Sequence, residues 1–275
     1  MITRIITAIV LLIVIIPVLV FSNTWVFPIA LAFCSGIAEL EMLKCMKLNK
    51  RISLIIPTVL YSVLVPFFVR FFDNVLVYLA VVFSAFLCMS LYCLTVSVFS
   101  KGKISFDSIS TAGFLTLYIT LGFSAIIMLR DFFPLGNYMY LLVFVGAWVT
   151  DTFAYFCGVL FGKHKLIPEI SPKKTIEGSI GGTVFAGIGF VVFGIIVNSI
   201  NSGDQTSYIK LFVYGIIAAL VAQIGDLCMS AMKRQHNIKD FGKLFPGHGG
   251  ILDRFDSIIA VSLGLFILEV FNYVF

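Results

Sequence analysis

Long apolar runs recur along almost the whole chain and leave little polar sequence between them. A transmembrane helix needs about 20 mostly apolar residues. Hydrophobic residues make up 60% of the 275 residues and charged residues 12%, whereas soluble domains carry about 45–50% and 25%. We therefore predict an all-α polytopic membrane protein. The nine apolar runs are residues 5–21, 25–43, 53–71, 75–99, 109–129, 138–161, 176–199, 208–230 and 255–274.

The loop charges predict how these spans are oriented. With a cytoplasmic N-terminus, only Arg70, Arg130 and Lys210 fall outside, and all other members of the 19 lysines and arginines fall inside. Cytoplasmic loops carry an excess of Lys and Arg, so we predict a cytoplasmic N-terminus and an outside C-terminus. The first run exceeds the apolar region of a secretion signal and lacks a small-residue cleavage site after it, so we expect it to be retained.

No linker, repeat or low-complexity tract divides the sequence. We predict a single integral-membrane domain over 1–275, with N-terminal spans in 1–130 and a motif-bearing part in 131–275. The net charge of +5 lies in short loops, which is not the separate basic face of a nucleic-acid-binding protein. The six cysteines form no CxxC or Cys/His pattern, so we expect neither disulfides nor zinc.

The segment from Ser230 to Asp256 carries the densest charge of the chain, beside spans apolar enough to lie in lipid. Such clusters are costly at a membrane and usually mark function. Asp253 and Asp256, three residues apart, share one helix face, and Asp226 lies near the end of the preceding span. Mg²⁺ prefers a few carboxylates together with phosphate oxygens and water, so we expect these three aspartates to converge on it. Favourable interaction of Asp253 and Asp256 with a helix N-terminus is the alternative.

Basic and glycine residues in the same segment are suited to phosphates. The lysines and arginines alternate with Gly, Pro and His, although any single one, such as Lys243, is equally well explained as a topology signal. Gly249 and Gly250 leave backbone N–H groups free to approach a phosphate. His248 is a candidate for phosphate contact or proton transfer, against the commoner structural role of a lone histidine.

The loop before residue 176 holds a second polar cluster, Ser171 to Gly178. We expect Pro172 to break the backbone and start the next helix, which places Lys173 and Lys174 at a helix N-terminus where a bound anion would relieve their conflict with the dipole. Glu177 is expected to pair with a lysine, with a place in the metal shell as the alternative. Asp151 is expected to be buried at membrane depth, where it needs a polar partner. Gly178, Gly181 and Gly182 form a small-residue face suited to close helix packing.

These residues resemble a known family. The segment Ser230 to Asp256 is similar to the signature of phosphatidate cytidylyltransferases, also called CDP-diacylglycerol synthases, without departure from it. The segments Asp151 to Tyr155 and Ser171 to Gly178 resemble that family as well. The matching signature positions are Ser230, Lys233, Arg234, Lys239, Asp240, Pro246, His248, Gly249, Gly250, Asp253, Arg254 and Asp256.

The resemblance implies transfer of a cytidylyl group from CTP to phosphatidate, giving CDP-diacylglycerol and pyrophosphate. It implies a homodimer in the lipid bilayer with a polar cavity facing the cytoplasm, a requirement for Mg²⁺, and K⁺ as a candidate second cation. The compact loops fit a bacterial inner membrane. The expected catalytic residues are Asp226, Asp253, Asp256, Lys239 and His248, of which the three aspartates bind metal. The expected substrate-binding residues are Ser171, Lys173, Lys174, Thr175, Glu177, Lys233, Arg234, Lys243, Gly249, Gly250 and Arg254.

Other function classes remain open at this point. A related CTP-using lipid enzyme, such as a prenol kinase or an archaeal-type lipid cytidylyltransferase, would differ in its acceptor. A transporter could use Asp151 and Asp226 as an ion path, but no pair of broken helices in matching halves supports this. A purely structural protein leaves the charged segment unexplained. Acyl-chain preference, CTP against dCTP, and the roles of Glu39 and Glu41 stay open.

Overall fold

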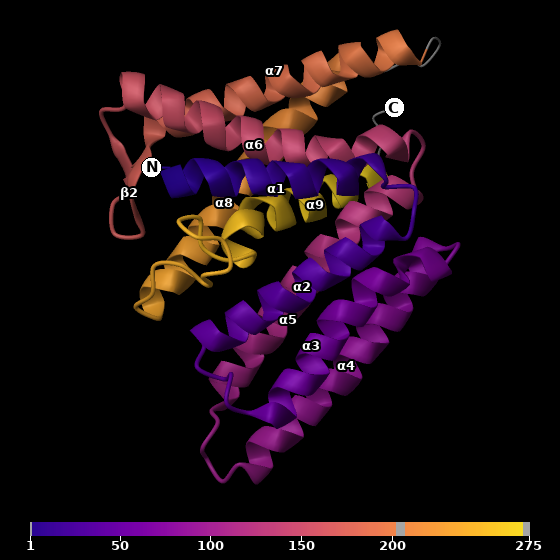
Figure 1. Cartoon of the computed structure of the whole chain (residues 1–275), viewed down its shortest axis with the longest axis vertical. Helices are drawn as coiled ribbons and strands as arrows, with labels where there is room; N and C mark the ends of the chain where they lie inside the picture. The colour runs from indigo at the N-terminus through magenta and orange to yellow at the C-terminus, as the bar shows by residue number, and fades with distance from the viewer. Residues whose placement is uncertain (1, 202–206, 272–275) are drawn as a thin grey trace. The chain divides into compact units, whose positions relative to one another are not determined.

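The computed structural model describes residues 2–201 and 207–271 (Figure 1). Residues 272–274, the end of the last predicted span, lie outside the described residues. Within the described part, an α-helix covers each of the nine predicted spans, with ends that differ by a few residues. The helices are α1 (Ile2–Val20), α2 (Val26–Cys45), α3 (Ile52–Phe68), α4 (Val75–Phe99), α5 (Phe106–Asp131), α6 (Gly136–Phe161), α7 (Ile176–Ile200), α8 (Tyr208–Gln235) and α9 (Leu252–Phe271).

Seven of these helices, α2 to α8, are long and apolar enough to cross a membrane, α3 together with the short 3-10 helix η1 (Val69–Phe71) that extends it. Many of their large apolar side chains are exposed, as on α4, where Leu76 is 70% and Leu91 65% exposed. Soluble monomers rarely expose such contiguous apolar surface, whereas helices that face lipid do. The all-helical membrane class is therefore confirmed, and the count of nine spans stays a prediction.

The described chain forms two compact units. The first comprises residues 1–128 and 236–255, and the second comprises 129–235 and 256–275. The division at residue 128 lies close to the predicted boundary at residue 130, but residues 236–255 of the motif-bearing part group with the N-terminal helices. Whether the chain behaves as a single domain stays a prediction.

In the first unit, α2, α3 and α4 pack side by side (Figure 1). Phe27, Met42 and Phe123 are among its fully buried side chains. Buried polar groups also join the helices: the Thr116 hydroxyl of α5 donates to Glu39 Oε1 of α2 at 2.8 Å. Such pairing offsets the cost of burying a polar group among apolar side chains.

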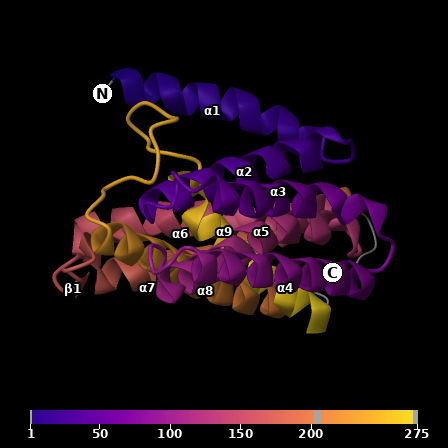
Figure 2. The same cartoon turned by 90° about the horizontal axis from the view of Figure 1, so that it is seen from below.

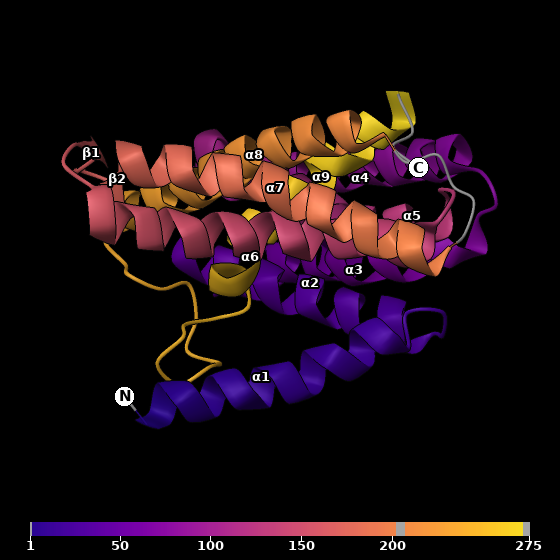
Figure 3. The ribbon, with the colours of Figure 1, turned by 90° about the horizontal axis from the view of Figure 1, so that it is seen from above.

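In the second unit, α7 packs against both α6 and α8 (Figure 3). The predicted small-residue face of α7 is the surface that meets α6. A Cβ atom at Gly178 would lie 2.5 Å from the Ala154 carbonyl oxygen, and one at Gly182 would lie 2.7 Å from the Thr150 carbonyl oxygen. The absence of side chains thus lets the two backbones approach closely, as the sequence predicted.

A two-stranded antiparallel hairpin precedes α7. It consists of β1 (Lys165–Ile167) and β2 (Ser171–Thr175), with Lys165 opposite Thr175. The expectation that Pro172 starts the next helix is wrong, because Pro172 lies within β2 and α7 begins at Ile176. Proline lacks an N–H but is tolerated on an edge strand, and both strands of a two-stranded hairpin are edges.

Candidate functional site

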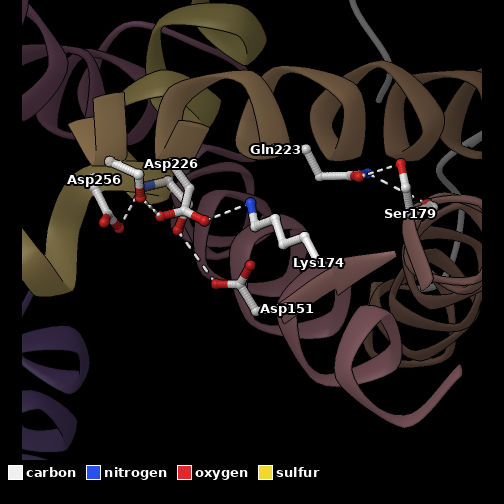
Figure 4. A network of polar contacts seen from close by, with 8 residues as sticks. Asp151, Lys174, Ser179, Gln223, Asp226 and Asp256 are labelled. Atoms are coloured by element: carbon white, nitrogen blue, oxygen red, sulfur yellow. Dashed lines mark hydrogen bonds and ion pairs between the residues drawn. The ribbon is translucent and has the colours of Figure 1, made fainter. Parts of the chain in front are cut away.

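The hairpin brings a lysine to an aspartate of α8. Lys174 on β2 forms an ion pair with Asp226, and each side chain is about one quarter exposed (Lys174 26%, Asp226 25%; Figure 4). The N-terminus of α7 is capped by Thr175, whose hydroxyl accepts the Gly178 N–H at 3.1 Å. Lys173 and Lys174 therefore lie on the strand β2 and not, as the sequence had suggested, at the N-terminus of α7. The ammonium group of Lys174 contacts the carboxylate of Asp226, which the sequence assigned to metal binding.

Asp226 belongs to a group of charged side chains from three helices. Asp256 on α9 is buried, with 9% of its surface exposed, and it interacts electrostatically with Asp226, Lys233 and Asp151. Lys233 is itself buried (8% exposed). Ser257 connects the group to α6, since its hydroxyl lies 3.5 Å from Asp151 Oδ2. Figure 4 shows Asp226 and Asp151 near the end of Lys174, with Asp256 on the far side of Asp226.

Asp151 differs from expectation. It is exposed rather than buried, and it lines a cavity of about 430 Å³. Lys165, Lys173 and Lys174 also line this cavity, and Tyr155 is one of its apolar lining residues. A cavity with three lysines and an apolar side has the character required to hold a phosphate that carries a hydrocarbon chain. Other residues of its lining are Val159, Leu166, Ser179 and Gln223.

A polar network holds α7 and α8 together beside the cavity. Gln223 of α8 donates to the Thr183 hydroxyl at 3.0 Å and accepts a hydrogen bond from the Ser179 hydroxyl (Figure 4). Sequence reasoning did not single out these residues. The only signal available was that polar side chains recur within apolar spans, where they are usually paired across helices.

Glu177 has a different partner from the one expected. Its carboxylate contacts His164 Nδ1 at 2.7 Å and accepts the His164 backbone N–H at 3.2 Å. The sequence suggested a lysine or a metal ion as the partner. This contact ties the first turn of α7 to the residue before β1 and so fixes the hairpin that carries Lys174.

The signature residues from Lys239 to Arg254 lie in the first unit, in the loop 236–251 and in the first turn of α9. Asp253 is buried (5% exposed), and its Oδ2 atom accepts the backbone N–H groups of Phe241 at 2.8 Å and Gly250 at 2.9 Å. A third N–H, that of Gly242, lies 3.4 Å away. Asp253 is thus an organising residue of this loop, whether or not it also binds a metal.

The same loop presents its basic side chains outward. Lys239 and Lys243 are exposed, as is Arg254 in the first turn of α9. The Pro-Gly-His-Gly-Gly turn depends on glycine at Gly247 and Gly249, whose φ angles of 78° and 86° lie in the left-handed region. His248 Nδ1 is buried without a hydrogen-bond partner in the described structure. An unpaired buried ring nitrogen is a group that a ligand or water can satisfy.

The expected site residues are therefore distributed over the two units. Lys174, Asp226, Lys233 and Asp256 are together in the second unit. Arg234 is there as well, exposed, and its Nε donates to the Ile170 carbonyl at 3.3 Å. Ser171 and Lys173 are on β2. Lys239, Lys243, His248, Gly249, Gly250, Asp253 and Arg254 belong to the first unit.

The fit of a metal ion rests on the chemistry of the aspartates. Within residues 2–201 and 207–271, no three His, Cys, Asp or Glu side chains are close enough to hold a metal by themselves. Mg²⁺, however, is commonly held by one or two carboxylates with substrate phosphates and water completing its shell. Asp226 and Asp256 fit that pattern, and binding by all three aspartates stays a prediction.

The chain is similar in sequence to known cytidylyltransferases. The family described as "Cytidylyltransferase family" matches residues 2–271. The chain is 38% identical over 175 residues to a protein of Bacillus subtilis (strain 168) named "Phosphatidate cytidylyltransferase", an alignment that covers 64% of this chain and 63% of that protein. A Staphylococcus haemolyticus protein of the same name is 33% identical over 259 residues, which cover 94% and 95% of the two chains. One from Rickettsia prowazekii is 46% identical over 132 residues, covering 48% and 58%.

Proposed function

The chain belongs to the cytidylyltransferase family, and we propose that it transfers a cytidylyl group from CTP to phosphatidate. The products are CDP-diacylglycerol and pyrophosphate. The observation that carries the proposal is the cavity of about 430 Å³ whose lining includes Lys165, Lys173 and Lys174 beside the carboxylates of Asp151 and Asp226. Lysines placed beside acidic residues at a membrane helix suit two phosphate-bearing substrates, one of which is a lipid.

The phosphate of phosphatidate is already a nucleophile, so the reaction needs no strong base. A non-bridging oxygen of this phosphate attacks the α-phosphorus of CTP. The new P–O bond forms as the bond from the α-phosphorus to the α,β-bridging oxygen breaks, and pyrophosphate leaves with the electron pair. Catalysis of such a transfer consists mainly of positioning and charge stabilisation.

The residues of this chain divide these tasks by location. We assign Lys173, Lys174 and Lys165 to holding phosphate groups at the cavity, where Lys174 would exchange its ion pair with Asp226 for a contact with substrate. The loop side chains Lys239 and Lys243, which are exposed, would bind further phosphate oxygens. We also assign Ser171, Thr175, Glu177, Lys233, Arg234, Gly249, Gly250 and Arg254 to substrate binding or its support, and His248 to a phosphate contact.

Asp226, Asp253 and Asp256 would hold Mg²⁺, with K⁺ as a second cation. When bound, Mg²⁺ neutralises charge on reacting and departing phosphate oxygens. Two features support this assignment: Asp256 is buried beside Asp226, and Lys233 and Lys174 offset their combined charge in the described structure.

The proposed setting is a bacterial inner membrane, with nine spans, a cytoplasmic N-terminus and an active site that faces the cytoplasm. The distribution of lysine and arginine supports this orientation. A homodimer is proposed from the family resemblance, and the mass of the protein in detergent tests it.

Purified protein tests the activity directly. We would supply α-³²P-labelled CTP, phosphatidate and Mg²⁺ in detergent, and follow label in the organic phase with and without EDTA. Metal-dependent label in a CDP-lipid is the expected result. Label from γ-labelled CTP in a prenol would instead identify a lipid kinase. Ion flux into liposomes without CTP turnover would identify a transporter.

A further inference from the structure

Glu41 is a buried acidic residue to which the motifs assign no role. It lies on the mostly apolar helix α2 and is 8% exposed. Burying a carboxylate in such surroundings is costly unless hydrogen bonds satisfy it. Glu41 Oε2 accepts the backbone N–H of Leu252 at 2.9 Å, and its Oε1 accepts that of Ile251 at 3.2 Å. Leu252 is the first residue of α9 and Ile251 directly precedes it, so neither N–H group has a partner within that helix.

Two glycines of the loop 236–251 leave the space that this carboxylate fills. A Cβ atom at Gly250 would lie 2.1 Å from Glu41 Oε1, and one at Gly242 would lie 2.0 Å from the same atom. Neither position is among the glycines with positive φ. Glycine is therefore required at these positions for close approach to Glu41, not for an unusual backbone conformation.

A second carboxylate, that of Asp253, also contacts these two glycines. Asp253 Oδ2 accepts the N–H groups of Gly250 and Gly242. The loop is thus held between one carboxylate from α2 and one from α9. Both are buried and both act on backbone N–H groups, so together they determine the path of the chain that carries Lys239, Lys243 and His248.

We propose that Glu41 is a positioning residue that holds the loop 236–251 in its working conformation by binding the N-terminus of α9. This inference rests on the proposed function for its kinetic consequence, because the loop supplies phosphate-binding groups to that reaction. Its structural part concerns only contacts within the first unit. Glu41 acts through the loop and touches no substrate.

The contact between Glu41 and Gly250 can be tested by a double-mutant cycle. Glu41→Ala removes the acceptor, and we expect kcat to fall by about ten- to a hundredfold, as for the loss of one or two hydrogen bonds to a charged acceptor. Gly250→Ala forces the carboxylate aside and should also lower kcat. In the Glu41→Ala background the clash is gone, so the double variant should match Glu41→Ala within about twofold. Glu41→Gln keeps one acceptor oxygen and should retain intermediate activity.

Loop order is read separately by limited trypsin cleavage at Lys239 and Lys243, relative to cleavage at exposed Lys163 in the second unit. Glu41→Ala should raise the relative rate at the two loop sites. Glu39→Ala is the matched control. It removes another buried glutamate of α2, one hydrogen-bonded to Thr116 on α5, and should leave the relative rate unchanged.

The two readouts separate failure of this inference from failure of the proposed function. If the wild-type chain forms no CDP-lipid, the proposed function is wrong, and the cleavage cycle still decides the role of Glu41. The inference is overturned if Gly250→Ala has the same effect on kcat and cleavage in both backgrounds. It is also overturned if Glu39→Ala opens the loop as much as Glu41→Ala does.

Discussion

Replacing Asp253 by asparagine separates two roles that this carboxylate can have. One is the predicted role as a metal ligand, which needs the negative charge. The other is the observed role as an acceptor for the N–H groups of Phe241 and Gly250 at 2.8 and 2.9 Å. Asparagine keeps an acceptor oxygen but removes the charge, whereas alanine removes both.

The size of the structural effect follows from these hydrogen bonds. A hydrogen bond to a charged group contributes roughly 1.5–3 kcal/mol and one between neutral groups about 0.5–1.5 kcal/mol. With two short bonds to a buried acceptor, Asp253→Asn should weaken the closed loop by about 2 kcal/mol. That corresponds to about a 30-fold increase in the open population and in the trypsin cleavage rate of the loop. Asp253→Ala leaves both buried N–H groups unpaired, at a cost of roughly 2–6 kcal/mol.

The assay compares loop cleavage with CDP-lipid formation over a range of Mg²⁺ concentrations. If Asp253 also binds metal, Asp253→Asn should lose far more activity than the cleavage rate explains, and the Mg²⁺ requirement should rise. Cleavage at the wild-type rate in Asp253→Asn would refute the energetic reasoning. Activity that falls only with loop opening, at an unchanged Mg²⁺ requirement, would refute the metal assignment.

Two further predictions concern the second unit. Gly182→Ala should lower the free energy of unfolding by about 1–3 kcal/mol, because its Cβ would lie 2.7 Å from the Thr150 carbonyl oxygen. Thermal unfolding in detergent measures this change. Gly189→Ala is the mild control, because the nearest contact of its Cβ would be at 3.4 Å. Lys174→Met should lower kcat/KM by about ten- to a hundredfold through loss of a phosphate contact. Partial recovery in Lys174→Arg would distinguish lost charge from lost packing. Full activity in Lys174→Met would exclude Lys174 from the site.

The helices could be predicted from the sequence because each apolar run is long enough to be read alone. The hairpin Lys165–Thr175 could not, since strands of three and five residues show too little alternation to recognise. Pro172 was misread for a related reason: proline fits both a helix start and an edge strand. Only the pairing of Lys165 with Thr175 separates these two possibilities.

The candidate site was predictable in its residue types but not in its contacts. The sequence indicated Asp226, Asp253 and Asp256, and the burial of Asp253 and Asp256 agrees with a special role for each. The sequence could not indicate that Glu41 meets Ile251, because the two are separated by 210 residues. Nor could it decide that Asp253 binds the loop backbone, since a carboxylate in a first helical turn is favourable on general grounds.

The first unit is discontinuous, because it is closed by residues 236–255. During synthesis, α2 to α5 therefore leave the ribosome long before the chain that completes their unit exists. Until Ile251 and Leu252 arrive, Glu41 lacks the backbone donors that satisfy it. The Thr7 hydroxyl of α1 likewise donates to the Pro246 carbonyl, at 3.0 Å, only after the loop 236–251 has been synthesised. Figure 2 shows this loop beside the N-terminal part of α1. Assembly of the N-terminal helices is thus coupled to synthesis of the chain as far as Leu252, and a fragment that ends before it lacks the backbone donors for Glu41.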